Sequence, residues 1–351
     1  MVFKLMEKFS ELAFNIVNNL LKIQSNDVIS ISGEIHNDNN SNDPLIELPL
    51  IEELAIAIRK RKAFPVLEMS TEKLKKRFYA EMPEDVFSVP PNYYKSWINA
   101  IDKFIEISWE SYSSDFHETS DKQIKQFKDS TNSIMQHLFQ QKKKIIFLNF
   151  PTQQLAEYIG KDYEKIIDIY IQGVNCNYNL LKINGEEYRE RYFSFSNYRI
   201  TTNDETLAIK INRDKPILFS GDLVEHQIIV LPTGIIEFPI VRESMNGIYF
   251  AEKIYYKDRN YNNIKIKFEN GTIRYVAFKE DKKGNFHLQN ELINSDKECF
   301  LTLGFNQDIK EYTNYFSYDR CIEGNISMKF FDKNSKPIFL SNINSKIDKE
   351  K

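Results

Sequence analysis

The sequence predicts an α/β domain with a parallel sheet, followed by a β-rich (α+β) domain. In the first half, apolar strand-like runs alternate with helix-like segments, a rhythm typical of a parallel sheet covered by helices. From about residue 191 the pattern changes to short alternating runs separated by Gly and Asn turns. The length of 351 residues indicates two domains at about 150 residues each, which we place at residues 1–175 and 176–351.

The N-terminal segment predicts an amphipathic helix packed on a core, because its apolar residues recur at helical spacing. These residues are Leu5, Phe9, Leu12, Ala13, Ile16, Val17 and Leu20. Charged residues interrupt the apolar runs, so the segment is neither a signal peptide nor a bilayer span, which needs roughly 18 apolar residues. A helix on a membrane surface is the alternative, and the mixed charges of the polar face do not favour it. We therefore expect no membrane association.

The remainder of the first domain is expected to alternate strands and helices. The strands are expected at residues 28–32, 64–69, 103–109 and 144–150, and the helices at residues 46–61, 71–79, 120–141 and 152–159. Gly33 ends the first strand, Ser70 or Thr71 caps the second helix of this set, and Pro151 stands at the start of the last. Basic residues in the last turn of helix 46–61 complement its dipole.

The second domain is expected to consist mainly of short strands. The runs lie at residues 198–200, 207–211, 227–231, 247–256, 264–268 and 273–278. Asn270 and Gly271 separate the last two runs, and this dipeptide predicts a hairpin because both residues tolerate the backbone of a two-residue turn.

Composition and charge restrict the class of protein. Lys and Arg number 47 and Asp and Glu number 50, so the net charge of −3 argues against a dedicated nucleic-acid binder. Aromatic residues make up 13% of the chain, which excludes disorder throughout. The three cysteines, Cys176, Cys299 and Cys321, form no Cys-x-x-Cys pair, and a sparse odd set is typical of the reducing cytoplasm, where we expect the protein.

Common catalytic motifs are absent from the sequence. It contains no Gly-rich phosphate-binding loop, no Gly-x-Ser-x-Gly and no His-Glu-x-x-His. Among the five histidines, His36, His117 and His137 are expected on the surface. His226 is the strongest candidate, because the nearby Asp222, Glu225 and Glu237 would raise its pKa toward neutrality. An exposed charged turn at the end of a strand is the alternative, and is about twice as common.

Five short motifs that follow one another along the second half of the chain are more informative about its family than any single residue. They run from Pro-Thr-Gly-Ile-Ile-Glu-Phe (232–238) through Glu-Ser-Met-Asn-Gly (243–247), Phe-Glu-Asn-Gly (268–271) and Leu-Gly-Phe-Asn (303–306) to Asp-Arg-Cys-Ile-Glu-Gly-Asn-Ile-Ser (319–327). This order resembles the thermophilic metalloprotease family, the aminopeptidase T and aminopeptidase S type of metallo-aminopeptidase. The resemblance extends to the α/β first half, and it implies a two-domain, two-metal hydrolase scaffold that forms dimers.

The departures from the family pattern fall on its metal ligands. The resemblance implies ligand carboxylates where this chain has Ile235 and Phe300, Asp-Glu-Lys where it has Asp319-Arg320-Cys321, and a histidine at Ser327. No histidine follows His287, so the final His-x-Asp pair is also missing. Aliphatic, aromatic and cationic side chains do not ligate Zn²⁺, Co²⁺ or Mg²⁺. We therefore expect no metal and no other cofactor.

Other residues near these positions have side chains that could ligate a metal, so a metal site with different ligands is an alternative. Glu237 shares a strand face with Ile235 and is a candidate displaced ligand. An alignment shifted by one or two residues would bring in Cys299, Asp319 or Glu323.

Three readings follow, and the first is preferred. It is a non-hydrolytic relative that binds a peptide or partner protein, as a homodimer built through the second domain. The second is an enzyme of altered chemistry on a peptide or small amide, with His226, Glu237, Glu243, Asp319 and Cys321 as candidate catalytic groups. The third is a working metal aminopeptidase with unrecognised ligands.

Overall fold

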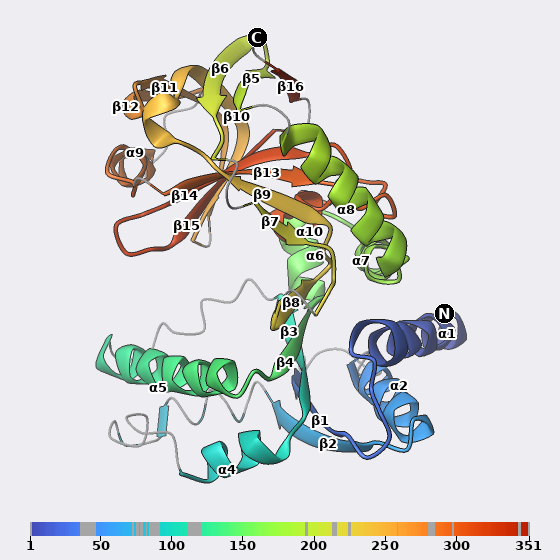
Figure 1. Ribbon diagram of the computed structural model, residues 1–351. Helices are drawn as coiled ribbons and strands as arrows, with labels where there is room; N and C mark the ends of the chain where they lie inside the picture. The colour runs from blue at the N-terminus through green and yellow to red at the C-terminus, as the bar shows by residue number, and fades with distance from the viewer. Residues whose placement is uncertain are drawn as a thin grey trace. The chain divides into compact units, whose positions relative to one another are not determined.

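The computed structural model describes most of the chain as two compact units (Figure 1). The described residues are 2–35, 47–71, 74, 77, 80–81, 83, 92–110, 121–193, 196–212, 216–223, 226–257, 259–279, 285–296, 298–342 and 345–349. Unit 1 comprises Met1–Asn175 and Asp222–Leu231, and unit 2 comprises Cys176–Gly221 and Pro232–Lys351. Parts of two sequence expectations, helix 71–79 and the loops with His36 and His117, lie outside the described residues.

Unit 1 contains a parallel sheet with the strand order β2-β1-β3-β4-β8. Its strands are β1 (Val28–Ile35), β2 (Phe64–Thr71), β3 (Lys103–Glu110), β4 (Lys144–Pro151) and β8 (Ile228–Leu231). The expected parallel α/β domain is confirmed. The run at 227–231 differs from the expectation, because it returns to pair with β4 instead of joining the β-rich sheet. Periodicity identifies a strand but not its partner, so the sequence pattern contains no sign of this return.

Helices lie on both faces of the unit 1 sheet (Figure 1). The helices are α1 (Val2–Phe14), continued by the π-helix η1 (Asn15–Leu20), α2 (Glu47–Lys60), α4 (Asn92–Ala100), α5 (Asp121–Gln140), α6 (Gln153–Ile159) and α7 (Tyr163–Val174). Apolar residues of α4 and α5 pack on Phe104 and Ile145 of the sheet. Thr152 caps α6 by accepting a hydrogen bond from the Leu155 amide at 3.1 Å, and Gly160 ends it in the left-handed conformation.

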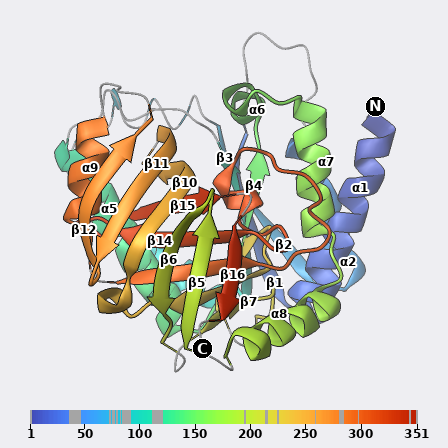
Figure 2. The same cartoon turned by 90° about the horizontal axis from the view of Figure 1, so that it is seen from above.

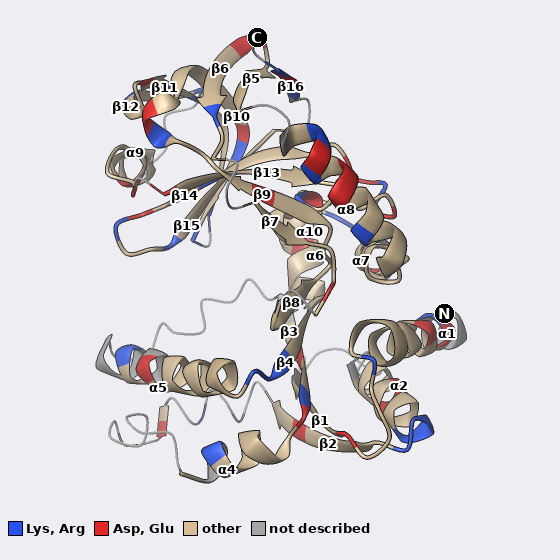
Figure 3. Ribbon diagram, in the orientation of Figure 1, with Lys and Arg blue, Asp and Glu red and all other residues tan. Residues whose placement is uncertain are grey.

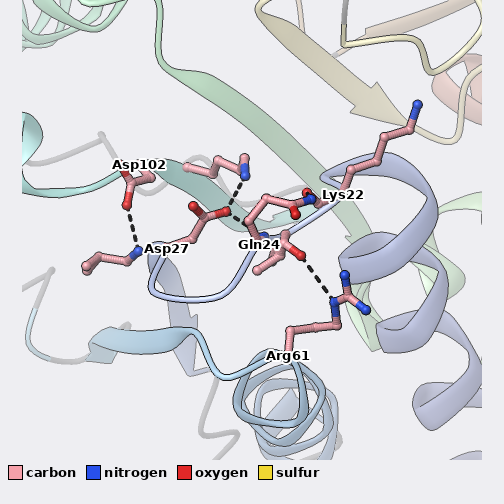
Figure 4. Close-up of polar contacts among 8 residues, drawn as sticks. Lys22, Gln24, Asp27, Arg61 and Asp102 are labelled. Atoms are coloured by element: carbon pink, nitrogen blue, oxygen red, sulfur yellow. Dashed lines mark hydrogen bonds and ion pairs between the residues drawn. The ribbon is translucent and has the colours of Figure 1, made fainter.

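Polar contacts connect the amino ends of β1 and β3 (Figure 4). Asp102 Oδ2 accepts from the Val28 amide at 2.7 Å, and Asp27 pairs with Lys103. The Asp27 carboxylate also accepts from the Gln24 amide at 2.8 Å. These contacts connect β1 to β3 and so support the register of the sheet.

Unit 2 contains, among the described residues, an eleven-stranded sheet in which all strand pairs are antiparallel. Its main order is β16-β5-β6-β10-β15-β14-β13-β9-β7, and β11 pairs with β10 and β12. The strands are β5 (Asn197–Thr202), β6 (Glu205–Lys210), β7 (Ile217–Phe219), β9 (Ile235–Pro239), β10 (Asn246–Tyr256), β11 (Arg259–Glu269), β12 (Thr272–Phe278), β13 (Cys299–Gly304), β14 (Ile326–Phe331), β15 (Pro337–Asn342) and β16 (Lys346–Lys349). The expected β-rich second part is confirmed.

Helices of different lengths accompany this sheet. They are α8 (Tyr178–Phe193), α9 (Asn285–Ile293), α10 (Phe316–Asp319) and the 3₁₀ turn η3 (Arg242–Ser244), and α9 lies beside β12 (Figure 2). The Asn270-Gly271 hairpin joins β11 to β12, and both residues have positive φ, as a two-residue turn requires.

One face of the unit 2 sheet forms the apolar core. Alternate residues of the central strands supply it, namely Ile236, Phe238, Leu301, Leu303, Ile326, Met328, Phe330, Ile338 and Leu340. Because side chains alternate along a strand, the intervening residues of these strands lie together on the opposite face. That opposite face carries the candidate site.

Candidate functional site

A row of polar residues crosses five neighbouring strands of unit 2. The strand register pairs Glu237 of β9 with Thr302 of β13, Thr302 with Ser327 of β14, Ser327 with Ser341 of β15, and Ser341 with Lys253 of β10. Directly paired residues point to the same side of a sheet, so these five form one polar row. Glu237, Thr302, Ser327 and Ser341 are all buried.

The carboxylate of Glu237 is neutralised by Lys329. The side chain of Glu237 is only 4% exposed, and the Lys329 ammonium group, on β14, forms an ion pair with its Oε2. The same ammonium lies 4.6 Å from the ring centre of Phe300 and 5.6 Å from that of Phe331. Aromatic faces attract a cation, so one carboxylate and two rings hold this charge in place.

Three of the positions matched to metal ligands lie on this same face. Ile235 pairs with Gly304, Phe300 with Lys329, and Ser327 with Thr302. All three matched residues are buried. They surround the Glu237–Lys329 pair with a methyl-bearing chain, an aromatic ring and a hydroxyl, none of which offers a metal an anionic donor.

The β13–β14 connection, residues 305–325, packs on the polar face. Phe316 of α10 stacks on Phe339 with ring centres 4.1 Å apart, and Asn314 accepts a hydrogen bond from Lys253 at 2.7 Å. Gly304 makes the close approach possible, because a Cβ there would lie 2.2 Å from the Ile322 carbonyl oxygen. This connection therefore covers the β15 and β10 end of the row.

Asp319 is a buried acid within this connection. Its Oδ1 accepts hydrogen bonds from the Thr313 amide and hydroxyl, both at 2.7 Å. Burial raises the pKa of Asp319 to about 6, although the Thr313 donors and the charge of Lys253 act in the opposite direction. Near neutrality this carboxyl is thus able to gain or lose a proton.

Arg320 and Cys321 follow Asp319 but offer little reactivity. The Cys321 thiol donates to the Pro232 carbonyl at 3.5 Å, and burial raises the pKa of this thiol to about 11, which keeps it protonated and poorly nucleophilic. The Arg320 guanidinium lies 5.9 Å from the ring centre of Phe316. Glu323 is exposed and accepts from Gln307 at 2.9 Å, and Cys299 points to the opposite face, in the apolar core.

The other two candidates lie elsewhere. Glu243 is exposed in η3, outside the row. His226 belongs to unit 1, where it precedes β8 and its carbonyl accepts from Lys144 at 3.4 Å. Its neighbour Glu225 lies outside the described residues. Of the five sequence candidates, only Glu237 lies in the row, and Asp319 lies in the connection that packs over it.

Sequence reasoning missed Lys329, Lys253, Thr302 and Ser341. Lys329 stands between apolar residues in an alternating strand, and such a polar position normally faces solvent. The one available signal was that Lys329 and Ser327 are two residues apart and therefore share a face. The partner strand of Glu237 is not visible in the sequence.

The donor set does not fit a two-metal centre. Among the described residues, no group of three or more His, Cys, Asp and Glu side chains is arranged to hold a metal ion. The carboxylate of the row already has a cation as its partner, so a divalent ion would have to displace the Lys329 ammonium.

Comparison with known proteins shows the fold. No family model and no curated protein matches the chain. The solved structure of wild-type AmpT from Thermus thermophilus matches with a TM-score of 0.69 over 98% of this chain and 95% of that chain, at 12% sequence identity. At this identity the match shows the scaffold alone. The chain therefore has an aminopeptidase-like fold, which confirms the part of the sequence resemblance that concerns architecture.

Replacing Lys329 with Met is expected to lower the free energy of unfolding by about 3 kcal/mol. The change leaves the buried Glu237 carboxylate without its cation, and losing one partner of a buried pair typically costs about 3–5 kcal/mol. The double variant Glu237→Gln/Lys329→Met is expected to regain most of this loss in urea denaturation. Lys267→Met, which breaks the exposed pair with Glu269, is the control and should leave the midpoint unchanged. Equal losses in the single and double variants would contradict the pairing.

Asp319→Asn is expected to change how stability depends on pH. Because the folded pKa of about 6 lies above the unfolded value, the folded state binds the extra proton, and wild-type stability falls as the pH rises from about 4 to 6. An uncharged Asn keeps an acceptor for Thr313 and does not titrate, so the stability of the variant relative to wild type should rise by up to about 2–3 kcal/mol between pH 4.5 and pH 7.5. Urea denaturation at both pH values measures the difference, with the exposed Asp308→Asn as control. Parallel pH profiles for Asp319→Asn and wild type would refute the assignment.

Proposed function

We propose that this protein is a non-hydrolytic relative of the metallo-aminopeptidases that binds a peptide or a partner protein. The observation that carries the proposal is which residues lie on the polar face of the unit 2 sheet. Ile235, Phe300 and Ser327 stand at the positions matched to metal ligands, and the nearby carboxylate of Glu237 is paired with Lys329. The aminopeptidase-like fold supports a scaffold suited to peptides. Without donors for a metal, no described residue of this face supplies a means to lower the pKa of a water molecule for attack on an amide.

The ammonium of Lys329 is the central reason for excluding hydrolysis. A divalent ion needs several anionic or imidazole donors within about 2.0–2.2 Å, and it would meet a fixed positive charge instead. The flanking Phe300 ring cannot compensate, since it already lies against the ammonium. The row keeps hydroxyl and ammonium groups, which bind and orient amides without cleaving them.

A metal and activity assay tests the proposal. We expect elemental analysis of the purified protein to find far less than one zinc, cobalt or manganese ion per chain. Incubation with Leu-Gly-Gly, with and without added Co²⁺ or Zn²⁺, should release no leucine. Stoichiometric metal, together with leucine release that a chelator abolishes, would overturn the proposal and would mean that other donors form the site.

An enzyme of altered chemistry is the second candidate, and Asp319 is the observation that favours it. A buried carboxyl with a pKa of about 6 is suited to general acid–base catalysis near neutrality. The Thr313 amide and hydroxyl hold this carboxyl group by two hydrogen bonds. Metal-independent conversion of a peptide or small amide, lost in Asp319→Asn, would favour this candidate over a purely binding role.

The protein is also proposed to form a homodimer through unit 2 and to act in the cytoplasm. Exposed apolar side chains lie on α8 (Leu180 and Ile183) and on α9 (Phe286 and Ile293). Acidic and basic residues alternate along α8 (Figure 3), so this helix does not repel a second copy. No helix among the described residues has the length and apolar character needed to cross a bilayer.

Sedimentation at micromolar concentration is expected to show a dimer. Replacing Phe286, which is 73% exposed, with Glu should shift the equilibrium toward monomer if α9 lies at the interface. Phe14→Glu on α1 in unit 1, where Phe14 is 58% exposed, is the control and should leave the dimer intact. A monomer for the unmodified protein would refute the proposed assembly.

A further inference from the structure

Three buried hydroxyl groups on the polar face of the unit 2 sheet have no hydrogen-bond partner. Thr302 is 3% exposed, Ser327 1% and Ser341 7%, and their side chains make no hydrogen bond with any residue that the structure describes. Unit 2 also contains hydroxyl groups that lack a partner and are fully occluded, at Ser220 and Tyr261, but the three hydroxyls of the row are not among them. The three oxygens of the row are therefore within reach of a small molecule.

The ion pair at the end of this row also has unused hydrogen-bonding capacity. The Lys329 ammonium group has three N–H donors, and Glu237 Oε2 is its one hydrogen-bond acceptor among the described residues. The other carboxylate oxygen, Glu237 Oε1, accepts no hydrogen bond from them and is not occluded. One acceptor and two donors thus lie side by side, because the ion pair itself holds them together.

The surroundings of this ion pair disfavour a ligand with a net charge. The pair is neutral as a whole, and both of its side chains lie largely out of solvent. Ile235 and Phe300 are buried on the same face, and the ring of Phe331 lies near the ammonium. A charged ligand would bring an unbalanced charge among these apolar groups, and nothing there would replace its lost hydration.

The other charges near the row lie at its far end. Lys253 is two strands beyond Ser327 in the sheet and donates a hydrogen bond to Asn314 at 2.7 Å. Its positive charge also favours the ionised form of Asp319. These two opposite charges compensate each other above the pKa of Asp319, so they add no net charge to the row at pH 7.5.

An uncharged amide matches the groups of the ion pair. Its carbonyl oxygen can accept from the Lys329 ammonium while its N–H donates to Glu237 Oε1, and the net charge stays zero. A ligand carboxylate would be attracted by Lys329 but repelled by Glu237, and a ligand ammonium would experience the reverse. The neutral amide is therefore the group that uses both partners.

The hydroxyl groups extend this match to a chain of amides. Thr302 lies directly opposite Glu237, and Ser327 lies directly opposite Thr302. Because neighbouring strands are about 4.8 Å apart, the row from Glu237 to Ser327 spans about 10 Å. An extended peptide covers about this distance with three residues, at roughly 3.3–3.6 Å each. A hydroxyl both donates and accepts, so each one can serve either group of an amide.

We propose that this row binds the uncharged backbone of an extended peptide segment, with one amide on Glu237 and Lys329 and the following amides on Thr302 and Ser327. The inference rests on the proposed function, because it names the ligand of the same face. It also separates this face from an aminopeptidase site in one respect. An aminopeptidase takes a free amino terminus, whereas this row selects peptide groups that carry no terminal charge.

Four probes built on dialanine isolate the effect of charge. N-acetyl-dialanine amide is uncharged, dialanine amide has a free amine, N-acetyl-dialanine has a free carboxylate, and dialanine has both. In calorimetric titration at pH 7.5, we expect the uncharged probe to bind at least about tenfold more tightly than each of the other three, because only it adds no charge to the row.

Variants of the row test the assigned residues. Thr302→Val removes a hydroxyl at similar volume and should weaken binding of the uncharged probe about fivefold. Thr272→Val, at an exposed threonine of β12, is the matched control and should bind like the wild type. Glu237→Gln leaves Lys329 with a net positive charge and should shift the preference to N-acetyl-dialanine. Thermal unfolding verifies that each variant is folded, and the four probes with Thr302→Val test the proposal if Glu237→Gln does not fold.

Three outcomes would overturn the inference. These are no binding of the uncharged probe, equal or tighter binding of a charged probe, and equal binding of the uncharged probe by Thr302→Val and wild type. Each of them leaves the proposed function in place as long as the protein holds no metal and releases no leucine. Stoichiometric metal with leucine release that a chelator abolishes would overturn the proposed function itself, so the two failures are distinguishable.

Discussion

The strand register of the unit 2 sheet is the constraint on which the candidate site depends. Side chains alternate along each strand, so one choice of register sends Ile236, Leu303 and Met328 into the core and brings Glu237, Thr302 and Ser327 together on the other face. A slip of one residue in β14 would bury Lys329 in the apolar core and expose Met328. The large apolar face therefore fixes the position of every polar group in the row.

Charge balance then determines what that face can do. The buried Glu237 carboxylate pairs with the ammonium group of Lys329, which also lies against the rings of Phe300 and Phe331. A single ammonium satisfies a single carboxylate, so this arrangement needs no metal to be stable. The environment of Asp319 is different: it accepts neutral donors from Thr313, and its pKa rises because the effect of burial exceeds that of these donors and of the Lys253 charge. The face thus combines one fixed ion pair with one acid that titrates near neutrality.

The sheets of unit 1 and unit 2 are alike in one respect, because each combines a group of polar side chains with a larger set of apolar ones. In unit 1 the polarity changes along the strands, from Phe104 to Glu106, while in unit 2 it changes from one face to the other. In unit 1 partial burial and then the charge of Glu106 raise the pKa of Glu68, and in unit 2 the carboxyl group of Glu237 is paired with Lys329.

The sequence by itself determined the fold class and the residue types at the positions matched to the ligands of the metallo-aminopeptidases. Strand–helix alternation predicts a parallel sheet because each strand needs a helical crossover, and Asn270-Gly271 predicts its hairpin because the local backbone requires positive φ. The side chains of Ile235, Phe300 and Ser327 have no carboxylate, and this chemistry is the same in any fold. Glu237 was also reached from the sequence, through its shared strand face with Ile235.

Only the tertiary structure decided which residues meet. The pairing of Glu237 with Lys329 joins positions 92 residues apart, and the row from Glu237 to Lys253 depends on strand neighbours that are not consecutive in the chain. The return of residues 222–231 to unit 1 separated His226 from the other candidates for the same reason. Local periodicity indicates on which face of a strand a side chain lies. The pairing of strands depends on the apolar surface buried over the whole sheet, and a short segment of sequence does not contain that information.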